Sequence, residues 1–148
     1  YGSTGGYRGR KHYLYEGGIR VPAIVRYPAL VEAGSNSDEL VIGTDLFVTL
    51  ARLGGGTVPD DRPIDGIDVR TVFSGGSLEQ RTVFWALDSV LDLEFAIRRG
   101  DWKLFIDREG NPRALYNLGT DPLEFFDRSA SEPDIVRDLV AQFEKLEL

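Results

Sequence analysis

The chain has 148 residues, of which 42% are hydrophobic and 28% charged, and its formal net charge is −7. These values fit one globular domain, or a domain-sized piece of a larger protein, whose core buries about two-thirds of the unfolded surface. The chain has no cysteine and one histidine, which excludes disulfides, thiolate zinc sites, a cysteine nucleophile and a histidine-rich metal site within it.

The charge is distributed unevenly along the chain. Residues 1–30 hold five cations and one carboxylate, so the acidic excess lies in the remainder. A nucleic-acid-binding protein usually shows a broad basic face, and we therefore expect no nucleic-acid partner. The basic end suits a small anionic ligand, while the acidic remainder is explained equally well by solubility alone. No apolar run approaches the roughly 20 residues that span a bilayer, so we expect no membrane span.

One stretch of the basic end is the candidate site. It combines four cations, the histidine, one carboxylate and three glycines within fifteen residues. Cations on a glycine-bearing loop, just before a β-type run, suit the binding of an oxyanion such as sulfate or phosphate. The stretch reads Arg8-Gly9-Arg10-Lys11-His12-Tyr13-Leu14-Tyr15-Glu16-Gly17-Gly18-Ile19-Arg20-Val21-Pro22.

The first half of the chain predicts loops, one strand and two helices. Residues 1–18 carry six glycines and predict irregular loop, and residues 19–27, rich in β-branched side chains, predict a short buried strand. A helix is expected to begin at Thr44-Asp45, with Thr44 as its cap, and to end at the glycines 54–56. Its apolar stripe is Leu46, Phe47, Leu50, Ala51 and Leu53, and a second short helix is expected over residues 69–73.

The loop between these helices carries four carboxylates. Carboxylates in a turn-rich loop are potential calcium ligands. The spacing does not fit an EF-hand and Pro63 interrupts it, so we favour a solvated loop. The carboxylates belong to Asp60, Asp61, Asp65 and Asp68.

The second half predicts an antiparallel meander crossed by a helix. Short strands are expected over residues 82–87, 95–98, 102–106 and 114–117, with tight turns at 99–101 and 109–112. The terminal helix has Pro133 in its first turn, and Ser131 with Asp134 resembles a capping box. It should lie across one face of the sheet, whose core we assign to the aromatic residues Phe84, Trp85, Phe95, Trp102 and Phe105.

Several motifs, in order along the chain, resemble the sulfatases, the arylsulfatase-like branch of the alkaline phosphatase superfamily. Lys11 with the string from Tyr15 to Pro22 is similar to the second signature of that family. Residues 44–50 resemble the helix that follows it, and residues 65–68 the loop after that helix. Residues 99–104, 115–118 and 121–124 resemble the strands and turn near the C-terminus of the family.

The resemblance also implies features that this chain lacks. Sulfatases use a formylglycine made from a Cys/Ser-x-Pro/Ala-x-Arg motif, and a calcium held by Asp and Asn side chains. The chain has no cysteine, none of its serines has that spacing to an arginine, and the family's paired aspartates are missing. We therefore expect the C-terminal third of a sulfatase, inactive alone, whose formylglycine and calcium come from residues outside this chain.

The expected fold class follows from the same resemblance. It is α/β, the C-terminal segment of an alkaline-phosphatase-like sulfatase fold, with a small antiparallel four-stranded sheet packed by a C-terminal helix. Residues 1–80 would form the end of the main α/β domain, with the lysine loop, a strand and a helix. Residues 81–148 would form a small C-terminal α+β subdomain.

The resemblance gives Lys11 a role in the site. Lys11 matches the family lysine that contacts the sulfate, so we predict it as a catalytic and substrate-binding residue; a lysine without that context is usually a solvated surface residue. His12 is either a substrate contact or an ordinary loop residue, because the family's catalytic histidines lie upstream. Arg8 and Arg10 either line the entry of an anionic substrate or are flexible surface arginines.

Four further residues are predicted to support the site. We expect Glu16 and Arg20 to form a structural pair, or to anchor backbone amides, and thereby to fix Lys11. Gly17 and Gly18 would supply backbone angles that other residues resist. No metal ligand is predicted in this chain.

The function implied for the complete enzyme is hydrolysis of sulfate esters, on carbohydrates or aryl sulfates. Two alternatives remain open at this stage: a non-catalytic binding module, and a phosphoesterase of the same superfamily. The expected partner is a sulfated small molecule or carbohydrate, and the expected location of the complete enzyme is periplasmic or extracellular. The isolated chain is expected to self-associate, because the predicted strand at 19–27 would have an unpaired edge.

Overall fold

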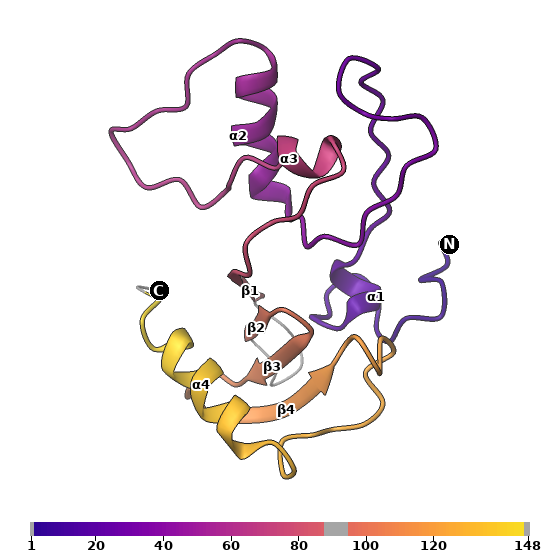
Figure 1. Cartoon of the computed structure of the whole chain (residues 1–148). Helices are drawn as coiled ribbons and strands as arrows, with labels where there is room; N and C mark the ends of the chain where they lie inside the picture. The colour runs from indigo at the N-terminus through magenta and orange to yellow at the C-terminus, as the bar shows by residue number, and fades with distance from the viewer. Residues whose placement is uncertain (1, 88–94, 147–148) are drawn as a thin grey trace. The chain divides into compact units, whose positions relative to one another are not determined.

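The computed structural model describes residues 2–87 and 95–146, which divide into two compact units (Figure 1). One unit, the sheet unit, contains residues 1–22 and 80–148; the other, the helical unit, contains residues 23–79. The fold is of the expected α/β class, with a four-stranded antiparallel sheet and a C-terminal helix. The predicted boundary between a main domain and a subdomain at residue 80 concerns the complete enzyme and stays a prediction.

The sheet is a meander with the strand order β1-β2-β3-β4. Its strands are β1 (Thr82–Ala86), β2 (Phe95–Arg99), β3 (Trp102–Ile106) and β4 (Pro112–Asn117), and all three pairings are antiparallel as predicted. The β2–β3 turn needs Gly100, whose φ of 58° is left-handed. Pro112 begins an edge strand, where its missing N–H removes no interior ladder bond.

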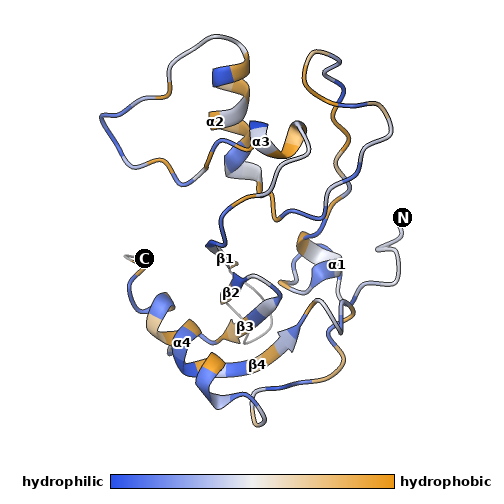
Figure 2. Ribbon diagram, in the orientation of Figure 1, coloured by the Kyte–Doolittle hydropathy of each residue, from blue (hydrophilic) through white to orange (hydrophobic). Residues whose placement is uncertain are grey.

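Helix α4 (Pro133–Phe143) covers one face of the sheet (Figure 1). Hydrophobic and hydrophilic positions alternate along this helix (Figure 2), and Leu139 packs on Ile97, Leu104, Ile106 and Leu115. Each such buried side chain stabilises the fold by about 1.5–3 kcal/mol. The predicted capping box is wrong: the residue before α4 is Glu132, with no side-chain cap, and the Ser131 hydroxyl donates to the Arg128 carbonyl instead.

The other face of the sheet is covered by the N-terminal loop and α1 (Glu16–Ile19). Leu14 packs with Ala96, Phe105 and Tyr116, and the rings of Tyr15 and Phe105 lie 4.8 Å apart. Because both faces are covered, β3 is buried continuously from Lys103 to Ile106 and does not alternate. Of the aromatic residues predicted as core, Phe84 is the exception, because its side chain is 39% exposed.

The helical unit is built around α2 (Gly43–Leu53) and α3 (Arg70–Phe73). The buried carboxylate of Asp45 accepts hydrogen bonds from Ile42 N at 2.8 Å and from Ile67 N at 3.0 Å. Thr44 therefore is not the cap that we predicted, since Asp45 satisfies a free backbone donor at the start of the helix. Thr49 is also buried and accepts from Val69 N at 3.0 Å, which ties α2 to the segment before α3.

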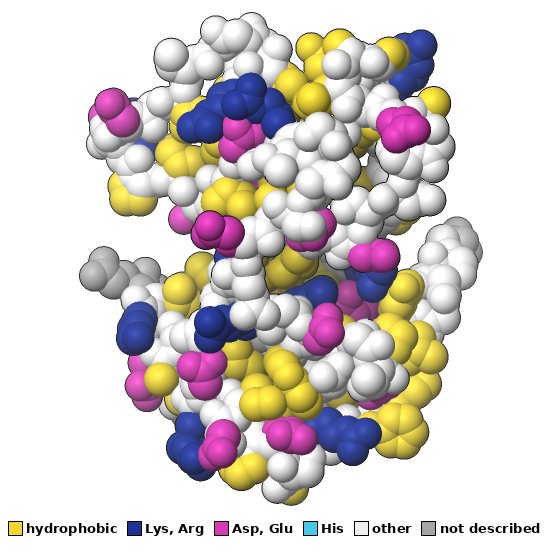
Figure 3. Space-filling view, viewed as in Figure 1, with side chains coloured by type: hydrophobic (Ala, Val, Ile, Leu, Met, Phe, Trp, Pro, Cys, Tyr) yellow, Lys and Arg dark blue, Asp and Glu magenta, His cyan; other side chains and the backbone are white. Residues whose placement is uncertain are grey.

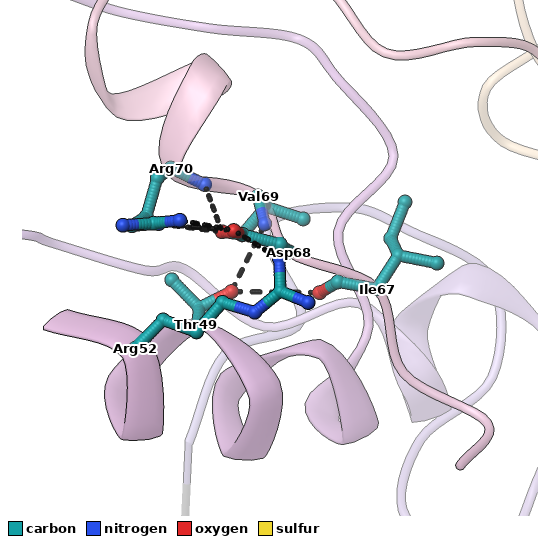
Figure 4. A network of polar contacts seen from close by, with 6 residues as sticks. All are labelled: Thr49, Arg52, Ile67, Asp68, Val69 and Arg70. Carbon is teal, nitrogen blue, oxygen red and sulfur yellow. Dashed lines mark hydrogen bonds and ion pairs between the residues drawn. The ribbon is translucent and has the colours of Figure 1, made fainter. Parts of the chain in front are cut away.

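Asp68 is the centre of an ion-pair network in this unit (Figure 4). Its carboxylate accepts from the Arg70 guanidinium at 2.8 Å and from Arg52 at 3.0 Å, and also from Arg70 N. The side-chain hydrogen bond from Arg70 is the main reason why the pKa of Asp68 lies well below its usual range. Asp61, another of the four loop carboxylates, pairs with the neighbouring Arg62 at the surface.

The strand predicted over residues 19–27 is absent. Residue 19 ends α1, and residues 20–27 run without regular secondary structure. The β-branched composition is correct for a strand, but no strand of the described residues pairs with this segment, and a strand needs such a partner for its backbone groups. Its side chains lie in solvent, with Val21 76% and Ile24 95% exposed.

Other apolar side chains of the helical unit are also exposed. The predicted stripe of α2 is not its buried face: Leu46, Phe47 and Leu50 are 45%, 54% and 59% exposed. The buried residues of α2 are instead Asp45, Val48 and Thr49. Figure 3 shows hydrophobic side chains on the visible surface of this unit. Within residues 2–87 and 95–146, no helix has the length and hydropathy of a membrane-crossing segment.

The exposed segment around Ile24 leads to a prediction about association. We expect the isolated chain to form dimers or larger species, because exposed β-branched residues without a partner strand favour pairing between chains. Substitution Ile24→Lys should shift the distribution toward monomer, as measured by size-exclusion chromatography with light scattering. Ser35→Lys, at an exposed polar position of the same unit, is the matched control. A wild-type chain that is monomeric at all concentrations would contradict the prediction.

The low pKa of Asp68 leads to a second prediction. Since the folded pKa lies below the unfolded value of about 4, the stabilisation is present above that value and is lost as pH falls through the folded pKa. Asp68→Asn should lower protection of the Val69 and Arg70 amides about fivefold at pH 7, because half-exposed arginines limit the ion pairs to about 1 kcal/mol. The difference between variant and wild type should shrink toward pH 2 in hydrogen-exchange measurements. Asp61→Asn, which removes an exposed pair, should leave these amides unchanged.

Candidate functional site

Lys11 and His12 lie at the corner of a tight turn, residues 10–13. Tyr13 N donates to the Arg10 carbonyl at 3.0 Å and closes the turn. His12 adopts a left-handed backbone with φ of 73°, and both side chains are exposed. The ammonium of Lys11 is therefore free to meet a ligand from solvent, and we call residues 10–13 the Lys11 turn.

Helix α1 approaches the Lys11 turn so closely that only glycine fits. A Cβ on Gly18 would lie 2.0 Å from the Tyr13 carbonyl oxygen, and one on Gly17 would lie 2.5 Å from that of Arg8. Gly17 N also donates to the Arg8 carbonyl at 2.7 Å. The two glycines are needed for space: neither has a positive φ, so the reason we expected from the sequence, unusual backbone angles, is wrong.

In the sheet unit, three ionisable side chains form a buried charge cluster: Lys103, Glu16 and Glu124. The Lys103 ammonium lies 2.9 Å from Glu16 Oε1 and 2.9 Å from Glu124 Oε1. Lys103 and Glu124 are fully buried, and Glu16 is 3% exposed. A buried charge is tolerated only when it is paired, and here one cation serves two carboxylates from opposite ends of the chain.

Glu124 contacts both sides of the Lys11 turn. Its Oε2 accepts a hydrogen bond from Glu16 N at 2.7 Å, after the turn. Its backbone carbonyl accepts from the Arg8 guanidinium at 2.7 Å, before the turn. Glu124 has a left-handed φ of 58°, an uncommon conformation for a residue other than glycine. One residue of the C-terminal region thus holds both flanks of the turn.

Opposing effects act on the ionisation of this region. Burial raises the pKa of the Glu124 carboxyl, and the adjacent Lys103 ammonium opposes that rise. Burial likewise raises the pKa of the Tyr15 phenol, against the influence of the Arg8 guanidinium. Burial therefore makes both Glu124 and Tyr15 harder to ionise than they are in water.

Arg8 is a fixed residue and not a flexible surface arginine. Besides the Glu124 carbonyl, its guanidinium donates to the Tyr116 hydroxyl at 3.2 Å and lies 4.1 Å from the centre of the Tyr15 ring. Arg10, by contrast, is exposed. Arg20 lies 3.8 Å from Glu16 Oε2, so Lys103 and not Arg20 is the closer cation of Glu16.

The structure brings together all site residues that we predicted, since they lie in one loop and the helix after it. The sequence reasoning missed Lys103 and Glu124. Both lie in segments that it compared with the family's C-terminal strands and turn, but a lysine within the apolar run 102–106 was the only local signal. A lysine in an apolar strand predicts that its charge is buried and paired with a carboxylate, but it does not identify which carboxylate.

Neither implied cofactor fits residues of this chain. Within residues 2–87 and 95–146, no group of three or more His, Asp or Glu side chains is placed to hold a metal ion. The chain also lacks a cysteine from which formylglycine is made. No chemical step is therefore assigned to calcium or formylglycine through the residues of this chain.

Comparison with known proteins identifies clear relatives. Residues 5–147 match the family model described as N-sulphoglucosamine sulphohydrolase, C-terminal. The chain is 34% identical over 139 residues to an arylsulfatase of Hemicentrotus pulcherrimus, covering 89% of this chain and 24% of that protein. It is 37% identical over 102 residues to the N-acetylgalactosamine-6-sulfatase of Canis lupus familiaris, covering 69% of this chain and 19% of that protein. The chain thus spans about a quarter or less of these curated relatives.

A solved structure agrees with the fold. The crystal structure of Ps i-CgsB in complex with k-i-k-neocarrahexaose superposes with a TM-score of 0.72 at 28% sequence identity. The match covers 88% of this chain and 29% of that one.

The close approach of α1 predicts the effect of one added methyl group. Gly18→Ala should destabilise the sheet unit by about 3 kcal/mol, because the Cβ meets backbone that cannot yield without moving the Lys11 turn. Urea unfolding followed by the fluorescence of Trp85 and Trp102, both in the sheet, measures the loss. Gly2→Ala is the control, since a Cβ there meets nothing within 4 Å. Equal stability of the two variants would contradict the packing described here.

Proposed function

Since this chain belongs to the sulfatases, as a member of their N-sulphoglucosamine sulphohydrolase C-terminal family, we propose that it supplies the sulfate-binding lysine of a sulfate ester hydrolase. The lysine is Lys11. The observation that carries the proposal is its position at the exposed corner of a turn whose two flanks are held by hydrogen bonds to Glu124, one buried and one partly buried.

The chemistry of Lys11 follows from its charge. Sulfate ester hydrolysis transfers the sulfuryl group away from an alkoxide or phenoxide, and negative charge grows on the leaving oxygen. An ammonium held in place beside the sulfuryl oxygens stabilises that charge without rearranging during the reaction. Within residues 2–87 and 95–146 Lys11 forms no ion pair, so its charge is not neutralised before the substrate arrives.

His12 is a second candidate contact in the same turn. Its side chain is exposed next to Lys11, and an imidazole ring can donate or accept a hydrogen bond, which suits contact with a substrate hydroxyl. We assign it to substrate contact and not to proton transfer, because no described group is shown to orient its ring. Glu16, Gly17, Gly18 and Arg20 support the turn from below.

The proposed substrate is a sulfated carbohydrate or an aryl sulfate. Relatives of this chain are an arylsulfatase and an N-acetylgalactosamine-6-sulfatase, and a structural neighbour was solved with a neocarrahexaose. We propose that the nucleophile and the calcium come from residues outside this chain, so that the chain alone is inactive. A periplasmic or extracellular location of the complete enzyme stays a prediction.

The assignment of Lys11 has a direct test. Lys11→Ala in the complete enzyme should lower kcat on a chromogenic aryl sulfate by about 10²–10³-fold, the usual effect of removing one group that stabilises transition-state charge. Its melting temperature should change little, because the side chain is exposed. Lys145→Ala, at another exposed lysine, is the matched control. Near-normal turnover of the Lys11 variant would end the assignment.

A further inference from the structure

We propose that Glu124 is a positioning residue for Lys11: it holds both flanks of the Lys11 turn and so sets where the ammonium points. This inference rests on the proposed role of Lys11. It concerns a residue more than a hundred positions away in sequence, to which the sequence reasoning gave no role.

The first step is that the turn does not hold itself. It is closed by one backbone hydrogen bond, from Tyr13 N to the Arg10 carbonyl, and its two central side chains lie in solvent. One such bond contributes about 1 kcal/mol, too little to fix a lysine side chain of several rotatable bonds in space. The position of the turn must therefore come from its flanks.

The second step is that both flanks end on Glu124. Arg8, two residues before the turn, donates to its backbone carbonyl, and Glu16, three residues after it, donates its N–H to the carboxylate. Both distances are 2.7 Å, as expected for bonds in which one partner is charged. Glu124 therefore works as a two-point clamp, which adds to the other contacts of the flanks: Arg8 also donates to the Tyr116 hydroxyl, and Leu14 is buried in the core.

The third step is the backbone of Glu124 itself. A left-handed conformation costs a residue other than glycine about 1–2 kcal/mol. In this conformation the carbonyl and the carboxylate of the same residue reach Arg8 and Glu16 on opposite sides of the turn. Strained backbone conformations cluster at functional sites, so the strain at Glu124 supports a functional hypothesis. Here the strained conformation is the one that makes both contacts to the flanks.

The fourth step separates positioning from catalysis. Glu124 and Lys103 are both fully buried, so neither contacts a substrate. Lys103 keeps the clamp charged, since its ammonium lies 2.9 Å from Glu124 Oε1 while Oε2 serves Glu16 N. Oε2 thus accepts a hydrogen bond, while Oε1 is buried and has the ion pair with Lys103 but no hydrogen bond of its own.

That double use decides the informative substitution. In Glu124→Gln, the side chain has one acceptor oxygen and one NH2 donor group. If the oxygen accepts from Glu16 N, the NH2 group faces the Lys103 ammonium, and if the oxygen faces Lys103, the bond to Glu16 N is lost. The backbone carbonyl that holds Arg8 remains. The variant therefore weakens one flank while keeping the size of the side chain, and Glu124→Ala removes the side-chain contacts altogether.

The first experiment uses this chain alone and needs no activity. Trypsin cleaves after Arg10 and Lys11 only when the turn opens, so the cleavage rate there reports its local stability. Glu124→Gln should raise that rate about tenfold, the loss of one charge-assisted hydrogen bond, and Glu124→Ala should raise it further. Cleavage after Arg137, in α4 of the same unit, should not change.

The control is Asp127→Asn, in the same loop as Glu124. The Asp127 carboxylate accepts from Leu115 N at 3.0 Å and Ser129 N at 2.8 Å, and it has no bond to residues 8–16. This variant should leave cleavage at the turn unchanged. If Glu124→Gln raises cleavage at Arg137 by the same factor as at the turn, Glu124 merely holds the unit together and the positioning role is overturned. No change at the turn also overturns it.

The second experiment is a double-mutant cycle in the complete enzyme, assayed on a chromogenic aryl sulfate. Glu124→Gln should lower kcat about tenfold when Lys11 is present and have little further effect in the Lys11→Ala background. Equal losses in both backgrounds would overturn the positioning role and leave the assignment of Lys11 intact. A Lys11→Ala enzyme of normal activity would instead overturn the proposed function, and the proteolysis result would still decide whether Glu124 holds the turn.

Discussion

The sheet unit depends on the ion pairs that Lys103 makes with Glu16 and Glu124. Removing an ionised group from water costs several kcal/mol, and the attraction within a buried cluster returns that cost only when its geometry is good. The cluster thus contributes little net stability, but it restricts which arrangements of the chain can fold. If Lys103 is removed, two buried carboxylates are left without a cation, at a cost of about 3–5 kcal/mol, whereas removal of either glutamate leaves one ion pair in place. Residues 16, 103 and 124 can therefore satisfy one another only when the loop, β3 and the turn after β4 meet in this arrangement.

This condition explains why the N-terminal loop packs as it does. An antiparallel sheet with one helix, such as α4 here, usually leaves its second face to solvent. In this chain the second face is apolar, with Ala96, Phe105 and Tyr116, and it is covered by Leu14 and Tyr15 of the loop. The hydrophobic contacts stabilise the loop on the sheet but do not fix its exact position, because they are non-directional. The charge cluster and the close approach at the glycines of α1 select one position of the loop on the sheet.

The sequence predicted what depends on neighbours along the chain. Strand and helix periodicity located all four strands and the helices α2, α3 and α4 to within a few residues, and the family resemblance was confirmed. The prediction failed where a distant partner decides the structure. The segment 19–27 has the composition of a strand but no strand to pair with among the described residues, and Thr44 and Ser131 have capping side chains that the surrounding contacts leave unused.

The same limit applies to the site. Lys11 was predicted because it lies in a continuous motif, and its exposed position in the turn is a local property. Glu124 escaped notice because its partners, Arg8 and Glu16, lie more than a hundred residues away. Only a fold that joins the two ends of the chain brings these residues into one cluster.

The contrast between Lys11 and Lys103 shows how the fold assigns different roles to one residue type. Lys103 lies in an apolar strand, and its charge is consumed by two buried carboxylates, so it can act only on the structure. Lys11 lies at the exposed corner of a turn, where its charge remains available to a ligand. An exposed lysine is ordinarily a mobile point charge with little directional value. Such a charge gains a defined position when the backbone of its turn is held from both flanks. In this chain Glu124, a member of the buried cluster, holds both flanks.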